Sequence, residues 1–347
     1  MTSEISIVGA DFSSLLQQEA NNQKFLDHEA EAPLETILGA HGVNYSRIRL
    51  WVDPEPGSND LATALTLAER SAGAGMQILL DLHFSDTWAD KSNQEAPAAW
   101  ATFDQKEMVA AVRSYTEDVV RAFAEQGTPV SMVQLGNEVT NGILWSWGKI
   151  DQPWGEYWEG FAELHEAGVA GAIAASPASP PRIMIHLHGG GDSRSVGRFL
   201  EKAQDHGMTF DVVGVTYYPF WNGSLDQLGR FLHFVAERYD RDVLVVETGY
   251  PWTLDDPAHC SNVVDEAEDL PTPRSHPPTP KGQSAYFEDL RAVLQSVPDG
   301  HGLGFVVWEP AWLPDVRLAG NVCNRYAALT LFDWHGNALP ALDRLAQ

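Results

Sequence analysis

The sequence has 347 residues, of which 44% are hydrophobic and 20% are charged, a balance typical of a globular enzyme. Asp and Glu number 48 against 22 Lys and Arg, which gives a formal net charge of −26. Such a chain repels phosphate groups and anionic lipids, so neither nucleic acid nor a membrane is an expected partner.

The amino-terminal residues contain no basic segment followed by an apolar run, and no stretch approaches the roughly 20 apolar residues that cross a bilayer. The sequence therefore predicts either a cytoplasmic protein or a secreted protein whose signal peptide has been removed. A monomer is expected.

Eight short runs rich in Val, Ile, Leu and aromatic residues recur along the chain and predict β-strands. They span residues 5–10, 46–51, 77–83, 131–137, 182–188, 211–217, 242–248 and 304–309. Segments with helical spacing lie between them, at residues 61–74, 106–126, 154–175, 193–206, 225–239 and 283–297. Several of the strands are continuously apolar, as expected for strands that are buried on both faces.

Strand followed by helix, repeated along the chain, predicts a parallel sheet, and eight strands favour an α/β fold closed into a (β/α)8 TIM barrel. The first strand is not followed by the Gly-rich turn of a dinucleotide-binding domain. The Pro-rich segment 271–280 is interpreted as a long loop, because a domain boundary there would leave the eighth strand outside the barrel. A single domain over residues 1–347 is predicted.

Polar and aromatic residues gather where the predicted strands end, which is where the active site of such a barrel lies. The candidate site residues are Asp11, Arg49, Asp81, His83, Asn137, Glu138, His186, His188, Tyr217, Glu247 and Trp308, and the following loops add Trp88.

Glu138 and Glu247 end the fourth and seventh strands. A carboxylate at the end of an apolar strand is costly unless it is paired, hydrogen-bonded or protonated. Two carboxyl groups at one rim are what glycoside hydrolysis requires, one as acid and the other as nucleophile or base. The alternative for either residue alone is a structural salt bridge, for example with Arg49.

Tryptophan is abundant, with 12 residues, and several of them fall in the predicted rim loops. Their rings would pack on the C–H faces of sugars, although each could instead cap the core. His186 and His188 share a strand face, and a catalytic metal held with His83 and Asp81 is a disfavoured alternative. No metal and no cofactor are therefore expected.

The two cysteines, Cys260 and Cys323, fall in loops after late strands. From the residues alone, two free thiols are favoured slightly over a disulfide that ties the loops together.

Seven phrases, in order along nearly the whole chain, resemble glycoside hydrolase family 53, the endo-β-1,4-galactanases. They are GADFS at 9–13, RIRLW at 47–51, DLHFSDTWAD at 81–90, QLGNEVTNGILW at 134–145, YYPFW at 217–221, ETGYPW at 247–252 and WEPAW at 308–312.

The resemblance implies retaining hydrolysis of β-1,4-galactan, the side chain of type I arabinogalactan in pectin, with Glu138 as acid/base and Glu247 as nucleophile. It implies that Asn137 binds the 2-hydroxyl of the sugar, and that Arg49 and Tyr217 hold and tune Glu247. The alternatives are a related glycosidase acting on mannan, xylan or β-glucan, a non-catalytic carbohydrate-binding barrel, and a metal hydrolase.

The chain also departs from the family pattern. Ser146 stands where the family has proline after Trp145, Lys91 stands where the family has proline after Asp90, and segment 186–192 is Gly-rich. The resemblance raises the Cys260–Cys323 disulfide. It also raises a structural calcium site, although a solvated acidic loop is favoured over it; the candidate ligands are Asp255, Asp256, Asp265 and Glu266.

Overall fold

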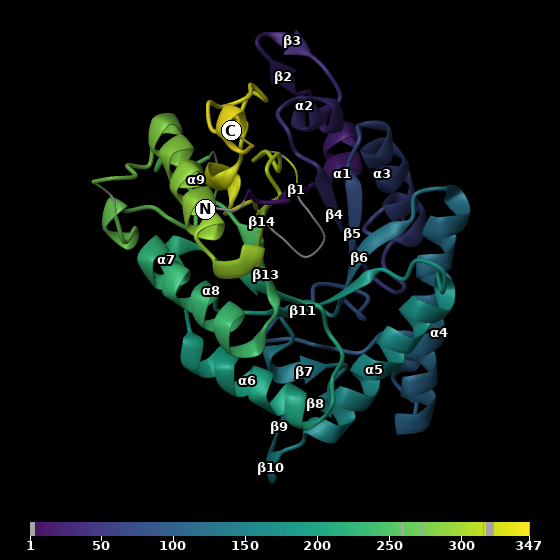
Figure 1. Cartoon of the computed structure of the whole chain (residues 1–347). Coiled ribbons are helices and arrows are strands. Elements are labelled where there is room, and N and C mark those ends of the chain that lie inside the picture. The colour runs from purple at the N-terminus through teal and green to yellow at the C-terminus, as the bar shows by residue number, and fades with distance from the viewer. Residues whose placement is uncertain (1–3, 258–259, 273, 315, 317–322, 347) are drawn as a thin grey trace.

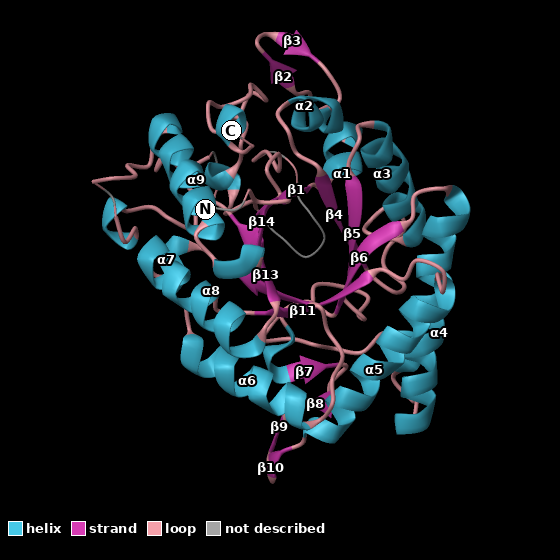
Figure 2. Ribbon diagram, in the orientation of Figure 1, coloured by secondary structure: helices cyan, strands magenta, loops and turns pink. Residues whose placement is uncertain are grey.

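The computed structural model describes residues 4–257, 260–272, 274–314, 316 and 323–346. Eight parallel strands close into a barrel in the order β1-β14-β13-β12-β11-β6-β5-β4 (Figure 2). Their bounds are Ile7–Asp11 (β1), Tyr45–Leu50 (β4), Gln77–Leu82 (β5), Val130–Leu135 (β6), Arg182–Leu187 (β11), Val212–Thr216 (β12), Asp242–Thr248 (β13) and Gly302–Trp308 (β14). The predicted fold class is confirmed.

The helices surround the barrel (Figure 1). The long ones are α3 (Leu61–Gly73), α4 (Gln105–Gln126), α5 (Trp158–Ala175), α6 (Ser193–Asp205), α8 (Leu225–Tyr239) and α9 (Pro280–Gln295). The longest of these, α4, begins with a capping box between Asp104 and Glu107 and ends at Gly127 in the left-handed conformation, so its terminal backbone groups are satisfied locally.

Shorter elements escaped the sequence prediction. The helices α1 (Leu15–Ala20), α2 (Leu34–Ala40) and α7 (Pro219–Asn222) are at most two turns long, too short for a 3.6-residue period to be visible. Three small hairpins pair β2 (Leu26–Asp27) with β3 (Ala30–Glu31), β7 (Gly142–Ile143) with β8 (Gly148–Lys149), and β9 (Asp151–Gln152) with β10 (Gly155–Glu156). Because the last hairpin occupies residues 151–156, α5 begins at Trp158 rather than at residue 154.

Side chains inside the barrel form two layers. Apolar residues from all around it, including Leu79, Met132, Met184 and Leu244, make one buried cluster. Two residues further along the same strands, the inward positions carry polar side chains such as Asp81 and Gln134, because successive inward residues are two apart. The fold therefore places a polar layer between an apolar floor and the carboxyl ends of the strands.

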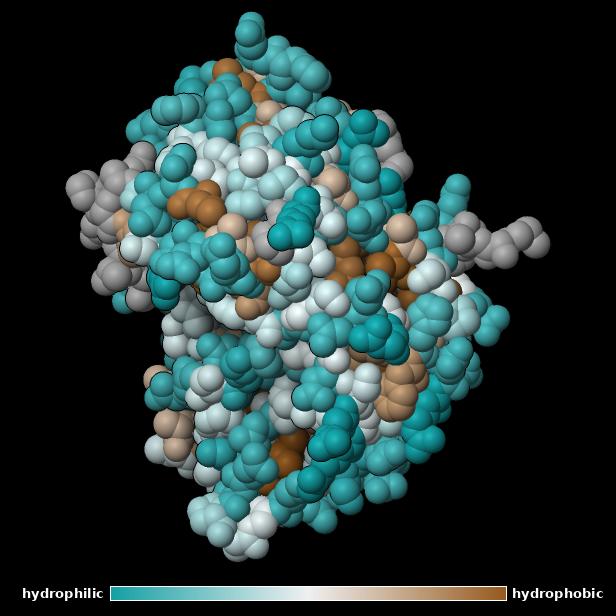
Figure 3. Space-filling model, turned by 90° about the vertical axis from the view of Figure 1, so that its left-hand side faces the viewer, coloured by the Kyte–Doolittle hydropathy of each residue, from teal (hydrophilic) through white to brown (hydrophobic). Residues whose placement is uncertain are grey.

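Cys260 and Cys323 form a disulfide, so the alternative that the residues alone favoured, two free thiols, is wrong. The face drawn in Figure 3 is mostly hydrophilic, with apolar side chains in small separate patches. Within the described residues, every helix is too short or too polar to cross a bilayer.

Candidate active site

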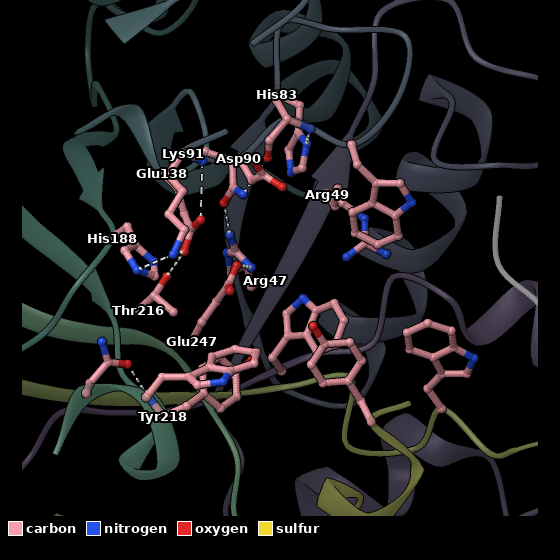
Figure 4. Close-up of a pocket in the computed structure, with 18 residues that line it drawn as sticks. Arg47, Arg49, His83, Asp90, Lys91, Glu138, His188, Thr216, Tyr218 and Glu247 are labelled. Atoms are coloured by element: carbon pink, nitrogen blue, oxygen red, sulfur yellow. Dashed lines mark hydrogen bonds and ion pairs between the residues drawn. The ribbon is translucent and has the colours of Figure 1, made fainter. Parts of the chain in front are cut away.

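A pocket of about 570 Å³ opens at the carboxyl ends of the barrel strands (Figure 4). It is lined by eight of the twelve candidate site residues, namely Arg49, His83, Trp88, Asn137, Glu138, His188, Glu247 and Trp308. The chain thus brings residues that are up to 259 positions apart (49 to 308) into one cavity.

The other four candidates, Asp11, Asp81, His186 and Tyr217, do not line this pocket. Asp11 is fully buried, where it accepts a hydrogen bond from the Ser13 hydroxyl (2.6 Å) and forms an ion pair with Arg47 (2.8 Å). The hydroxyl of Tyr217 donates to the Gly223 carbonyl (2.7 Å). Thr216 and Tyr218 line the pocket instead, because residues on either side of Tyr217 share the opposite face of the chain.

Arg47, rather than Arg49, contacts Glu247. The Arg47 guanidinium lies 2.8 Å from Asp11, 2.8 Å from Asp81 and 2.9 Å from the Oε1 atom of Glu247. Arg49 lies two residues further along β4 and forms its ion pair with Glu309 (2.8 Å), with its guanidinium 4.3 Å from the centre of the Trp88 ring. Both arginines point inward, but they lie in successive layers of the barrel.

Glu138 follows β6 through a tight turn. Gly136 has a φ of +90°, and Glu138 itself is left-handed with φ 49° and ψ 51°, a conformation that a non-glycine residue adopts at a cost of roughly 1 kcal/mol. The Oε1 atom of Glu138 accepts hydrogen bonds from Thr216 (2.7 Å) and from His188 (3.0 Å). Such strained residues cluster at functional sites, where the surroundings hold them.

The pKa values of the two glutamates move in opposite directions. Burial raises the pKa of Glu138, but hydrogen bonds from His188 and Thr216 and the neighbouring imidazoles outweigh it, and the pKa falls to about 2. Burial also raises the pKa of Glu247, and together with the negative charges of Glu138, Asp81 and Asp11 it outweighs the opposing charge of Arg47, so the pKa rises to about 8. The two carboxyl groups therefore share a single proton near neutral pH.

A network of buried hydrogen bonds links the side chains around the two glutamates. His186 contacts Asn137 Oδ1 (2.9 Å) and Thr216 Oγ1 (2.9 Å), and burial beside Arg47 lowers its pKa to about 3, so it is neutral. Asn137 accepts from Arg47 (2.8 Å) and donates to the Ala89 carbonyl (2.9 Å). Each of these side chains is oriented by at least two partners, which is how a site is held ready for its substrate.

Aromatic rings form one wall of the pocket. Trp308 lies at the centre, with its ring 5.9 Å from Trp312, 6.3 Å from Trp88 and 5.1 Å from Tyr326. All four rings line the cavity, and flat apolar faces of this kind suit the C–H faces of a sugar ring.

Several pocket residues were not singled out from the sequence. They are Arg47, Asp90, Lys91, Thr216 and Tyr326, with Ala89 and Asn222 beside them. Tyr218, at the end of a predicted strand, and Trp221 and Trp312, in predicted rim loops, also line the pocket. The sequence did contain an indication for Arg47, because it lies two residues from Arg49 and so faces the same side of the predicted strand. Lys91 and Tyr326 lie in loops, where no period indicates which way a side chain points.

Within the described residues, no three His, Cys, Asp or Glu side chains are grouped so as to hold a metal ion. Of the calcium candidates, Asp256 accepts from the Asn262 amide (2.8 Å), and the Asp255 carbonyl accepts from the Asn262 side chain.

Known proteins resemble this chain over its whole length. The sequence profile of glycosyl hydrolase family 53 matches residues 7–345. Arabinogalactan endo-β-1,4-galactanase A of Aspergillus niger is 40% identical over 323 residues, which cover 91% of this chain and 87% of that protein.

Two solved structures share the fold closely. The family 53 catalytic domain from Ignisphaera aggregans superposes with a TM-score of 0.90 at 30% identity and covers 99% of this chain and 98% of its own. A structure from a study of two fungal β-1,4-galactanases has a TM-score of 0.86 at 30% identity, covering 98% of this chain and 99% of its own.

Proposed function

The chain belongs to glycosyl hydrolase family 53, and on that premise we propose that it is an endo-acting, retaining glycosidase that cleaves β-1,4-galactan, the side chain of type I arabinogalactan. The observation that carries this proposal is the pair Glu138 and Glu247, which reach one pocket from the ends of β6 and β13. Two carboxyl groups across one sugar-sized cavity are the machinery of glycoside hydrolysis.

Glu247 is the nucleophile in this proposal. Its carboxylate attacks the anomeric carbon to form a glycosyl-enzyme, and Arg47, 2.9 Å away, stabilises the attacking anion. Arg47 is itself held by Asp11 and Asp81, so the guanidinium is in place before the substrate arrives.

Glu138 is the general acid in the first step. It gives a proton to the departing glycosidic oxygen, and in the second step it takes a proton from the water that hydrolyses the glycosyl-enzyme. The reaction needs no metal and no cofactor.

Substrate binding sets the proton where the reaction needs it. The two carboxyl groups of the free enzyme share one proton, and catalysis requires that proton on Glu138, with Glu247 ionised. The glycosidic oxygen offers Glu138 a hydrogen-bond acceptor, which favours the protonated form of that carboxyl group. As Glu138 becomes neutral, Glu247 loses a repelling charge and its ion pair with Arg47 stabilises the carboxylate.

The remaining pocket residues bind the sugar chain. Asn137 lies beside Glu138, where its amide contacts the 2-hydroxyl of the sugar at the cleavage point. His83 and Arg49 supply further polar groups at the pocket wall, and Trp88 and Trp308 supply apolar faces.

The test is reducing-sugar release from linear β-1,4-galactan, with mannan, xylan and β-glucan in parallel. Galactan is expected to be cleaved by the wild type and by Glu201→Ala, which removes an exposed carboxylate paired with Arg238, and not by Glu247→Ala. Cleavage of another polymer in place of galactan would overturn the substrate and leave the mechanism standing.

Azide distinguishes the two glutamates. Azide can replace the missing carboxylate of Glu247→Ala by attacking the anomeric carbon directly, which yields an α-glycosyl azide. In Glu138→Ala it intercepts the glycosyl-enzyme and yields the β-anomer, provided that the substrate has a leaving group that needs no protonation. The reverse assignment of anomers would exchange the proposed roles.

A further inference from the structure

Three side chains form a hydrogen-bonded row along one side of the pocket (Figure 4). The Lys91 ammonium lies 2.7 Å from the Nε2 atom of His188. The other ring nitrogen of His188, Nδ1, lies 3.0 Å from the Oε1 atom of Glu138. Lys91 comes from the loop after β5, and His188 follows β11. These two strands flank β6, the strand that precedes the proposed acid.

The chemistry of these groups determines where the protons lie. An ammonium has three donors and no lone pair, so Lys91 must donate and His188 Nε2 must accept with a free lone pair. The neutral ring then carries its single proton on Nδ1, and this proton is donated to Glu138.

The tautomer in turn decides which oxygen of Glu138 can carry the catalytic proton. Oε1 already accepts from His188 and from the Thr216 hydroxyl (2.7 Å). Among the described residues, the contact that Oε2 makes is a long one, 3.4 Å, with the main-chain amide of Lys91. The acid form of Glu138 therefore holds its proton on Oε2.

We propose that Lys91 is a positioning residue that holds His188 in the Nδ1–H tautomer and thereby keeps the catalytic proton of Glu138 on Oε2. The inference rests on the proposed role of Glu138 as acid/base. It concerns a lysine that stands where the family pattern has proline.

The other charged and titratable groups around Glu138 cannot take over this task. They are Arg47 on β4, Asp90 beside Lys91, His186 on β11, Tyr218 after β12, Glu247 on β13 and Tyr326. Arg47 is engaged by three carboxylates, and both ring nitrogens of His186 have partners of their own.

Without Lys91, His188 Nε2 loses its donor and is free to take up a proton. The imidazolium would then favour ionised Glu138 and draw away the proton that the leaving group needs.

The first measurement is ¹⁵N–¹H NMR of the histidine rings in wild type and Lys91→Met, with His188→Asn identifying the His188 signals among the 12 histidines. In the wild type, Nδ1 is expected to carry the proton and Nε2 none, because Nε2 accepts from Lys91. In Lys91→Met, a proton should appear on Nε2. Identical His188 spectra in the two proteins would overturn the proposal, whatever the substrate of the enzyme is.

The second measurement separates an effect on the acid from a general loss of structure. Lys91→Met should lower kcat on galactan about tenfold, because general acid catalysis is worth roughly 10²- to 10⁴-fold. A dinitrophenyl galactobioside, whose leaving group needs no proton, should be hydrolysed within about twofold of wild type in the glycosylation step. Equal losses on both substrates would contradict the proposal.

Two controls complete the design. Lys24→Met removes an exposed lysine that pairs with Glu31 and should leave both readouts unchanged. In a His188→Asn background, Lys91→Met should add no further change in the pH profile, because the lysine acts through the imidazole. If galactan is not a substrate, the NMR result still stands or fails by itself, so a failure of the proposed function is distinguishable.

Discussion

Arg47 forms ion pairs with three carboxylates in the interior of the barrel. Its side chain is 1% exposed and contacts Asp11, Asp81 and Glu247, of which the first two are also fully buried. Burial opposes the charge of the guanidinium, and the three carboxylates outweigh burial and raise its pKa. A cluster of this kind is retained for positioning more than for stability, because replacing a buried ion pair by apolar groups is often neutral or stabilising.

Glu247 should make the stability of the protein depend on pH. Its folded pKa is about 8 against an ordinary 4.5, so the folded protein keeps a proton that the unfolded chain releases. The stability that this proton provides is complete below pH 4.5 and is lost as the pH rises to about 8. Between pH 4 and pH 7.5 the wild type should therefore lose about 2–4 kcal/mol of stability through this group. Glu247→Gln has no carboxyl group to titrate at this position and should not show this loss.

Denaturant unfolding of both proteins at the two pH values measures this difference. Glu201→Gln, an exposed carboxylate, should show almost no such change. A gap between wild type and Glu247→Gln that stays constant from pH 4 to pH 7.5 would mean that burial does not raise the pKa of Glu247.

At the scale of single elements, the turn after β6 places the proposed acid. Strand β6 ends at Leu135, and within three residues the chain reverses so that Glu138 points back into the pocket. Gly136 makes this possible with a φ of +90°, and a Cβ atom there would lie 2.5 Å from Val139 Cγ1 and 2.7 Å from Ile143 Cγ2. The turn is therefore both conformationally demanding and tightly packed.

Gly136→Ala should consequently reduce kcat as well as stability, because the methyl group displaces the turn that carries Glu138. Gly127 is the matched control, since it has nearly the same φ, +89°, at the end of α4 but no atom within 4 Å of its Cβ position. Gly127→Ala should cost about 1 kcal/mol of stability, the ordinary penalty of a left-handed alanine, with kcat unchanged. Equal kcat in the two variants would show that the packing of this turn does not position Glu138.

At the scale of the whole molecule, the disulfide joins the loops that follow β13 and β14. Cys260 and Cys323 are 63 positions apart, and the later loop also carries Tyr326, a member of the aromatic wall. The bridge therefore ties part of the substrate pocket to the strand that ends near the nucleophile.

Removing this bridge should lower the free energy of unfolding by about 4 kcal/mol, because a cross-link across a loop of this length restricts the unfolded chain. Denaturant titration of Cys260→Ser/Cys323→Ser against the wild type, each with and without reductant, measures the effect. Reductant should bring the wild type to the stability of the double variant and leave the variant unchanged. If reduction leaves wild-type stability intact, the bridge does not stabilise the fold.

The sequence by itself determined the barrel and the rim. Strand identity follows from the apolar character of short segments, which is local, and all eight strand ends fall within three residues of their predicted positions. The position of polar residues at strand ends is equally local. For this reason Glu138, Glu247 and six further residues could be assigned to one pocket before any tertiary contact was known.

Only the tertiary structure decided which side chains meet. Arg47 and Arg49 have the same parity on β4, and only the folded structure shows that Arg47 contacts Asp11, Asp81 and Glu247. Arg49 contacts Glu309 instead. Lys91 and His188 are 97 residues apart, and they meet because β5 and β11, the strands that precede them, both pair with β6. Pairing across a closed sheet is a non-local property, whereas the residue patterns that a sequence displays report only local backbone geometry and burial.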